Sequence, residues 1–496
     1  MSFSGGACLT GALLVLTSAM AWSAPPETAA HASKAPPGVI FEALLSLGFH
    51  ISPQQAAADY KEILRGPKSL AEQETALRHD GVPTTAKELR ARLPHVPRQQ
   101  NAAPLWMALR KPLQSLDPPL KTLLSASPDS FRRVERKLGL KLMARQKDIL
   151  SKILTAADKP HAQFQINWKD LNEDRVQTRK SQTLRNAARL LWIRGAQLAA
   201  AGRYSQAVRV EAQGFRIADQ AMEDPDPISL LVGTAIDGIT LEGMSQLLES
   251  AGSRGSVASA IREAILEHQS RFHADRPLWG DVLMDVQIID QCAAKPELLG
   301  QLVGQGKPLT FNLHTPTERR LLSDLIQASG ARVLQLQHRL IRSAHLPTYL
   351  QQVASSRKQH IDDADIEKRF QQEDPLDILP TTLFLGPLWR PEATVVAQEQ
   401  ILIAAASLLM YHSRHGAFPA RLETAVPHSF DPFSGHALRY RREGNGFVIY
   451  SVGESGDLDP DRSDIKPGQE ASYFRYPGGR SSPTSPSAGA ARRAGR

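Results

Sequence analysis

Acidic side chains gather in one short segment near the C-terminus. Glu454, Asp457, Asp459, Asp461 and Asp464 fall within 11 residues. Hard cations such as Ca²⁺ are bound by several oxygen atoms from a flexible loop, and this spacing can supply them. We therefore expect Asp457, Asp459 and Asp461 to be metal ligands, with Ca²⁺ as the ion. The spacing is not that of an EF-hand, and the alternative is a solvated acidic turn.

Sequence patterns that carry catalysis are absent from the chain. It has no G-x-S-x-G, no H-E-x-x-H, no phosphate-binding G-x-x-x-x-G-K-[ST] and no dinucleotide fingerprint. His412 and His415 share a helix face, but further metal ligands cannot be placed, so we expect them to interact with the helix C-terminus. Cys292 is expected to be a small buried apolar residue. No catalytic or cofactor-binding residue is predicted.

A helix followed by a β-hairpin is expected to position the acidic segment, within a module over residues 391–470. Apolar periodicity predicts a helix over 393–413. Alternating apolar residues predict strands over 437–442 and 447–452, and the glycine-rich segment 443–446 is typical of a hairpin turn.

This module resembles the C-terminal region of the major pseudopilins of type II secretion. The resemblance implies a small β-sheet and calcium in the acidic loop. In pseudopilins the module directly follows an N-terminal assembly helix, whereas here it lies about 400 residues downstream. The resemblance therefore concerns shape and not assembly into a pilus. The matching residues are His415, Gly416, Phe418, Pro419, Leu422, Asp431, Pro432, Gly435, Tyr440, Ser451, Gly453 and Asp457.

A helical body is predicted over residues 98–390, preceded by a short helical region over 39–97. In the short region Thr85 and Glu88 have capping-box spacing and predict a helix start. Apolar periodicity in the body predicts further helices. These cover residues 228–248, 256–272, 279–292 and 317–341.

A pair of helices over residues 187–222 is the most regular part of this body. It resembles a tetratricopeptide repeat in the spacing of Gly195, Gly202, Tyr204 and Ala207. Small residues at Gly195 and Ala207 would let two antiparallel helices approach closely. Only one clear copy is present, whereas a solenoid needs about three.

The N-terminus resembles an export signal. Residues 7–22 are apolar but too short for a comfortable membrane span, and they end in an A-x-A cleavage pattern. We therefore predict a signal peptide over 1–24 and a linker over 25–38. No Lys or Arg precedes the apolar run, so the alternative is an uncleaved segment that anchors the chain in the inner membrane.

The net charge of +8 is concentrated in the C-terminal tail, because no acidic residue follows Glu470. The remaining chain is nearly balanced, which argues against nucleic-acid binding. Pro, Gly, Ser and Ala dominate the tail, and we predict that residues 471–496 are disordered.

The whole chain resembles a family of long, exported, uncharacterised bacterial proteins. The resemblance covers roughly residues 96–465 and implies architecture but no activity. The expected fold is mainly α, with a helical-hairpin, partly solenoid-like body and a small C-terminal β-hairpin module. The expected function is a non-catalytic interaction scaffold with a protein partner, in the periplasm or outside the cell. The alternative is a hydrolase whose site is assembled from scattered residues of the helical body.

Overall fold

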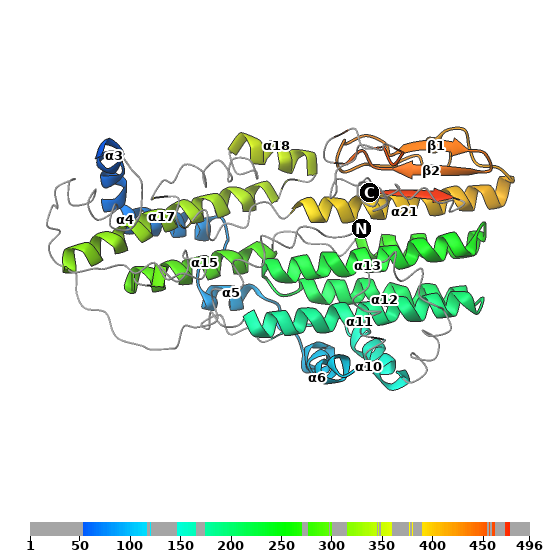
Figure 1. Ribbon diagram of the computed structural model, residues 1–496, viewed down its shortest axis with the longest axis horizontal. Coiled ribbons are helices and arrows are strands. Elements are labelled where there is room, and N and C mark those ends of the chain that lie inside the picture. Colours follow the sequence, from blue (N-terminus) through cyan, green and yellow to red (C-terminus); the bar gives the residue numbers. More distant parts are fainter. Residues whose placement is uncertain are drawn as a thin grey trace, which may run out of the picture.

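The computed structural model describes residues 53–116, 120, 146–164, 174–269, 276–296, 298–299, 315–344, 346, 349–359, 376, 379, 389–453, 456, 459–461 and 472–476. The predicted signal peptide and linker lie outside these residues. The described part is an elongated, mainly helical molecule with a small antiparallel sheet near one end (Figure 1), which confirms the predicted fold class.

Three long helices form the layer around which one half is built. They are α11 (Asp174–Ala200), α12 (Tyr204–Met222) and α13 (Pro227–Ala251). Gly202, at φ 74°, makes the turn between α11 and α12, a conformation that glycine adopts without strain. The layer contains the helix pair predicted from residues 187–222.

Two further pairs of elements cover this layer. On one side, α6 (Ala103–Gln114) and α10 (Lys147–Ala157) bury Trp106 and Ile153 against α11 and α12. On the other side, α14 (Gly255–Gln269) and α21 (Trp389–His415) pack against α12 and α13.

The sheet rests on α21. Its strands are β1 (Arg439–Glu443), β2 (Gly446–Tyr450) and β3 (Tyr473–Tyr476), in the order β1-β2-β3, and both pairs are antiparallel. Phe447, Ile449 and Phe474 join the core beneath the sheet. A short 3₁₀ turn, η5 (Leu422–Thr424), lies between α21 and β1.

The other half of the molecule is organised around α17 (Pro316–Ala344). This helix packs against α15 (Arg276–Ala294), α4 (Gly66–His79), α3 (Pro53–Leu64) and α18 (Tyr349–Gln359). Here α5 (Ala86–Arg92) covers α15, with Leu89 against Leu283, and η2 (Arg98–Gln100) leads into α6.

The capping box and the hairpin predicted from the sequence are confirmed. Glu88 N donates to Thr85 Oγ1, and Glu88 returns a side-chain contact to the backbone of Thr85. Arg439 pairs with Tyr450 across the hairpin, and Gly444 has the positive φ of 56° that its turn requires.

β3 was not anticipated, because residues 473–476 fall within the tail predicted to be disordered. For these residues the prediction is wrong. Phe474 is 2% exposed and its ring lies 6.0 Å from that of Phe447. Burial of this aromatic side chain stabilises a strand whose neighbours in sequence favour disorder. Residues 477–496 lie outside the described part.

Two described helices, α13 and the 391–415 part of α21, are long and apolar enough to cross a membrane. In both, 61% of the most apolar stretch is buried inside the protein. Their apolar side chains therefore form the core between the layer, α14 and the sheet.

Candidate functional site

Two of the three predicted metal ligands lie beside arginines. Asp461 pairs with Arg441 from β1, and with Arg475 from β3 at 2.5 Å. Asp459 accepts a hydrogen bond of 3.3 Å from Tyr450 Oη. The hydrogen bonds from Arg475 and Arg441 lower the pKa of Asp461. The carboxylate of Asp461 thus links the two edge strands through ion pairs.

The third predicted ligand, Asp457, lies outside the described residues. Among the residues that are described, no group of three or more His, Cys, Asp or Glu side chains could hold a metal ion. A cation bound by Asp459 and Asp461 would have to displace Arg441 and Arg475 from them.

Asp431 fixes the start of the sheet. It is fully buried, and its carboxylate accepts hydrogen bonds from Ser451 Oγ and Val452 N, both at 2.9 Å, and from Phe433 N at 3.0 Å. Gly435 has a φ of 70°, which reverses the direction of the chain so that the N–H of Gly435 donates to Asp431 O. The aspartate is therefore a structural residue of the turn before β1.

A buried histidine surrounded by carboxylates lies where α12, α13, α14 and α21 meet. His268 Nδ1 lies 3.1 Å from Asp219 Oδ1, and Nε2 lies 3.1 Å from Asp237 Oδ1 and 3.6 Å from Glu399 Oε1. Phe215 stacks on the imidazole with ring centroids 4.5 Å apart. The side chain of His268 is only 3% exposed, so these contacts form away from water.

The carboxylates hold His268 in its charged form. Burial alone would lower the pKa of His268, but the negative charge of Asp237 and the contact with Asp219 raise it to about 11. Burial raises the pKa of Glu399 to about 7. Because both ring nitrogens face carboxylates, neither is available to take a proton from a nucleophile as the histidine of a catalytic triad does.

A second buried ion pair lies at the start of α13. Lys180 Nζ lies 2.5 Å from Asp224 Oδ2 and 4.0 Å from Asp226 Oδ2, and it donates to Ser229 Oγ at 2.8 Å. Asp226 is also the N-cap of α13, because it accepts from Ser229 N at 2.8 Å. Lys180 is 1% exposed and therefore depends on these partners to carry its charge inside the protein.

The contact between Lys180 and Ser229 has the composition of a Ser–Lys catalytic pair but not its electrostatics. The lysine of such a pair must be neutral to accept the serine proton. Here Asp224 favours the charged ammonium, and Ser229 Oγ donates its own proton to Asp226 at 2.5 Å. Ser229 is moreover fully buried.

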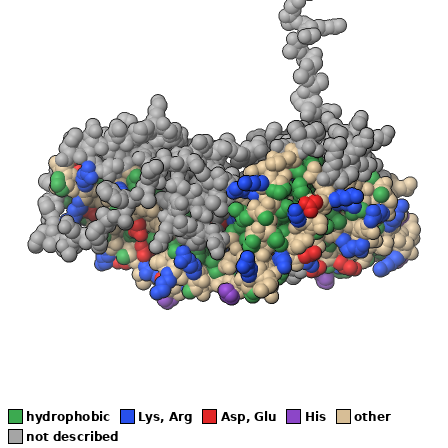
Figure 2. All heavy atoms as spheres, turned by 90° about the horizontal axis from the view of Figure 1, so that it is seen from below, with side chains coloured by type: hydrophobic (Ala, Val, Ile, Leu, Met, Phe, Trp, Pro, Cys, Tyr) green, Lys and Arg blue, Asp and Glu red, His purple; other side chains and the backbone are tan. Residues whose placement is uncertain are grey.

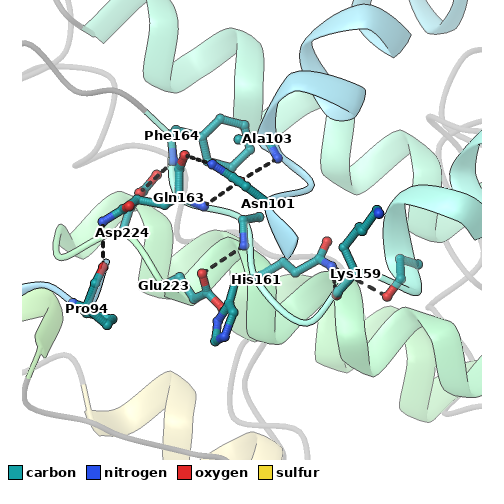
Figure 3. A network of polar contacts seen from close by, with 12 residues as sticks. Pro94, Asn101, Ala103, Lys159, His161, Gln163, Phe164, Glu223 and Asp224 are labelled. Carbon is teal, nitrogen blue, oxygen red and sulfur yellow. Dashed lines mark hydrogen bonds and ion pairs between the residues drawn. The ribbon is translucent and has the colours of Figure 1, made fainter. Parts of the chain in front are cut away.

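The C-terminal end of α12 holds together two segments that are distant in the sequence (Figure 3). Glu223 binds His161 Nδ1 at 2.9 Å and accepts from Ala162 N at 2.8 Å. Asn101 Oδ1 accepts from Gln163 N at 3.0 Å, beside a parallel β-bridge between Asn101 and His161. These contacts form a polar clasp between the start of α6, the segment after α10 and the end of α12.

A buried glutamate occupies the close approach between α11, α12 and α13. A Cβ added at Gly195 would lie 2.1 Å from Glu211 Oε1, and one added at Gly243 would lie 2.5 Å from Oε2. Burial raises the pKa of Glu211 well above its ordinary value. The two glycines thus leave room for a carboxyl group whose neutral form is favoured by burial.

The contacts of His412, His415 and Cys292 indicate structural roles for these residues. His412 stacks on Phe418 at 4.4 Å, and His415 Nδ1 contacts Tyr411 O at 2.9 Å near the end of α21. Cys292 is buried, and burial raises the pKa of its thiol to about 12. A thiol with such a pKa is not a nucleophile at neutral pH.

The sequence contained a signal for His268 that the motif search did not use. His268 continues the apolar stripe of Ile261 and Ile265 in α14. A polar residue at a core position of a helix needs a buried partner. The partners themselves come from three other helices, which periodicity alone does not bring together.

Comparison of the chain with protein-family models, with curated proteins and with solved structures finds no match.

Proposed function

We propose that the protein is a non-catalytic helical scaffold of the cell envelope that binds a protein partner. The observation that carries the proposal is the way the buried charged residues are used. Lys180 is held by Asp224, and His268 by Asp219 and Asp237, inside the protein. Groups held this way specify how helices pack and are not free for acid–base or nucleophilic chemistry.

The outer helix face formed by α6 and α10 supplies a surface for a partner. Figure 2 views the molecule from this side and shows apolar and basic side chains side by side. Met107 is 38% exposed on α6, next to the exposed Lys111, and Lys147 and Lys152 are exposed on α10. Exposed apolar surface rimmed by charge is typical of protein interfaces.

The scaffold proposal is tested by crosslinking in cells that express the full chain. A photo-crosslinking amino acid replaces Met107, and a second variant carries it at the exposed Lys61 of α3 as a control for position. We expect one crosslinked envelope protein from position 107 only, and we expect Lys111→Glu to abolish it. Equal crosslinking at both positions, or none at either, would contradict the proposal for this face.

Export is part of the same proposal and follows from the N-terminal segment. Cell fractionation with N-terminal sequencing is expected to find a chain that begins near Trp22 or Pro25 outside the cytoplasm. An intact N-terminus in a membrane fraction would instead support the anchor formed by residues 7–22.

An enzyme is the second candidate, and one observation favours it. Glu399, with a pKa near 7, lies 3.6 Å from His268 Nε2, and such values are common in general acids and bases. Any hydrolysis of ester, phosphoester or glycoside test substrates should then be lost in Glu399→Gln. Activity that survives this substitution would exclude the cluster as its source.

We also propose that Asp457, Asp459 and Asp461 bind Ca²⁺. The support is the oxygen-rich spacing, and the competing contacts are those of Arg441 and Arg475. At a hundredfold excess of Ca²⁺ over the dissociation constant, binding would stabilise the fold by about 2.7 kcal/mol. The full chain should therefore melt higher in Ca²⁺ than in chelator, and Asp457→Ala should abolish the difference. Identical melting would leave an arginine-paired acidic turn.

A further inference from the structure

Two buried aspartates face one glutamine between α15 and α17. Asp281 and Asp285 lie one turn apart on α15 and are 3% and 2% exposed. Gln337 reaches them from α17, and its Nε2 lies 2.5 Å from Asp281 Oδ2 and 3.0 Å from Asp285 Oδ2. A single amide group therefore contacts both carboxyl groups in a buried layer.

No basic side chain in the described part of the molecule contacts this pair. From the start of α13, the charge of Asp226 acts on Asp281, but Asp226 is itself negative and is held by Lys180. From α5, Arg92 lies over the ring of Trp279, 5.9 Å from its centroid. Two ionised carboxylates here would be uncompensated, and buried charges without partners are strongly unfavourable.

The glutamine shows why two charges here would be unfavourable. Gln337 is fully buried, and its Oε1 has no hydrogen-bond partner. Its Nε2 faces both carboxyl groups, so its two N–H groups are the donors that the pair shares. A proton held by one carboxyl group removes one of the two buried charges that these N–H groups would otherwise have to stabilise.

We propose that Asp281, Asp285 and Gln337 form a proton-holding latch between α15 and α17. The latch is closed while the aspartate pair carries at least one proton, and it loosens when both carboxyl groups ionise. It adds a pH response that the scaffold function does not require.

The close packing of α15 against α17 explains why ionisation of the aspartate pair would affect the stability of α15 along its length. A Cβ added at Gly330 of α17 would lie 2.7 Å from Ile289 Cγ2 of α15, so the helices touch directly one turn beyond Asp285 and two turns from Gln337. Little space is available for water to solvate new charges. Burial raises the pKa of Asp281 to about 7, and burial and the charge of Asp281 raise the pKa of Asp285 well above its ordinary value.

The test compares the full chain with the variant Asp281→Asn/Asp285→Asn, which keeps the shape of the pair but cannot ionise. Hydrogen exchange of α15 is measured at pH 6 and pH 8.5 and corrected for intrinsic exchange. We expect protection in the natural protein to fall roughly tenfold or more, because each pH unit above the pKa changes the population by about tenfold. The double variant should change by less than about twofold. An equal fall in both proteins would overturn the proposal.

Infrared spectroscopy provides a readout that does not depend on opening. At pH 6 the natural protein should show the carbonyl stretch of protonated carboxyl groups, and Asp281→Asn/Asp285→Asn should weaken it. Asp148→Asn, a change at an exposed carboxylate on α10, is the control and should leave the band unchanged. If the double variant does not fold, Asp281→Asn and Asp285→Asn serve singly in both measurements, and at least one of them should weaken the band. A band that none of these substitutions alters would show that both carboxyl groups are ionised at pH 6 and would also overturn the proposal.

Discussion

Lys180 is the residue whose charge neutralises the carboxylates at the start of α13. We expect Lys180→Met to destabilise the protein by about 3–5 kcal/mol, since it leaves Asp224 buried and unpaired. Lys152→Met is the matched control, because Lys152 forms an exposed pair with Asp148 and should cost at most about 0.5 kcal/mol. Urea unfolding monitored by circular dichroism measures both. Equal losses in the free energy of unfolding for the two substitutions would show that the buried pair of Lys180 and Asp224 stabilises the protein no more than an exposed pair does.

The same residues show what a sequence can predict of a site. Asp431 and Gly435 form a local turn before β1, and both were singled out in the sequence as residues that match the pseudopilin pattern. Asp459 and Asp461 were predicted to lie close together, but the pairing of Asp461 with Arg475, which comes from a strand 14 residues further along the chain, was not predicted. The cluster around His268 brings this residue beside Glu399, 131 positions away in the sequence, and no local rule predicts such a contact.

The helices α11, α12 and α13 approach one another closely around Glu211. We expect Gly195→Ala and Gly243→Ala each to destabilise the fold by about 1–3 kcal/mol, because the new methyl group would overlap Glu211. Gly238→Ala is the control on α13. An added Cβ there meets nothing within 4 Å, so alanine should be neutral or stabilise by up to about 1 kcal/mol. Thermal melting of the three variants distinguishes overlap from helix propensity.

A second variant identifies the carboxyl group as the cause. Glu211→Ala in the Gly195→Ala background should recover part of the lost stability, since it removes the overlapping atoms. If the double variant is as unstable as the sum of the single ones, the glycine serves another purpose.

Truncating the chain after or before β3 measures how much this strand stabilises the protein. A chain ending at Tyr476 should melt like the full chain, because the removed segment is rich in Pro, Gly, Ser and Ala. A chain ending at Glu470 should lose at least about 2 kcal/mol, since it removes the buried Phe474 and the ion pairs of Arg475. Equal melting of both truncated chains would show that β3 adds nothing to the sheet.

Elements with strong local signals were predictable, and elements that depend on distant partners were not. Periodicity located α13 and α17 within a few residues of their ends, and the capping box located the start of α5. The helix pair was predicted as a close approach of small residues, but the glutamate that fills it was not. β3 is only 4 residues long and pairs with β2 across an acidic loop, so its sequence alone carries little signal.

For the whole molecule, the buried acids predict an unusual dependence of stability on pH. Asp281 and Glu399 have folded pKa values of about 7, above those of the unfolded chain, so their stabilising contribution is complete below about pH 4 and is lost as the pH rises through 7. His268 acts in the same direction: its contribution is complete below its unfolded pKa of 6.5 and is lost as the pH rises through about 11.

The free energy of unfolding should therefore fall between pH 5 and pH 8, by up to about 1.4 kcal/mol per pH unit for each proton taken up on folding. Urea unfolding at several pH values measures this, and Glu399→Gln should reduce the slope. A free energy that rises over this range would contradict the assignment of protonated acids to the core.

The ion pairs that join α3 and α4 to α17 connect segments that are synthesised at different times. Glu62 binds Arg332, and Asp80 binds Arg342, across 270 and 262 residues. At a translation rate of about 5–20 residues per second, α3 and α4 would wait roughly 15 to 50 seconds for these partners. Their apolar faces, including Ile63 and Leu77, remain uncovered during that interval. A nascent chain of this protein should therefore depend on a chaperone that holds its first hundred residues until α17 has emerged.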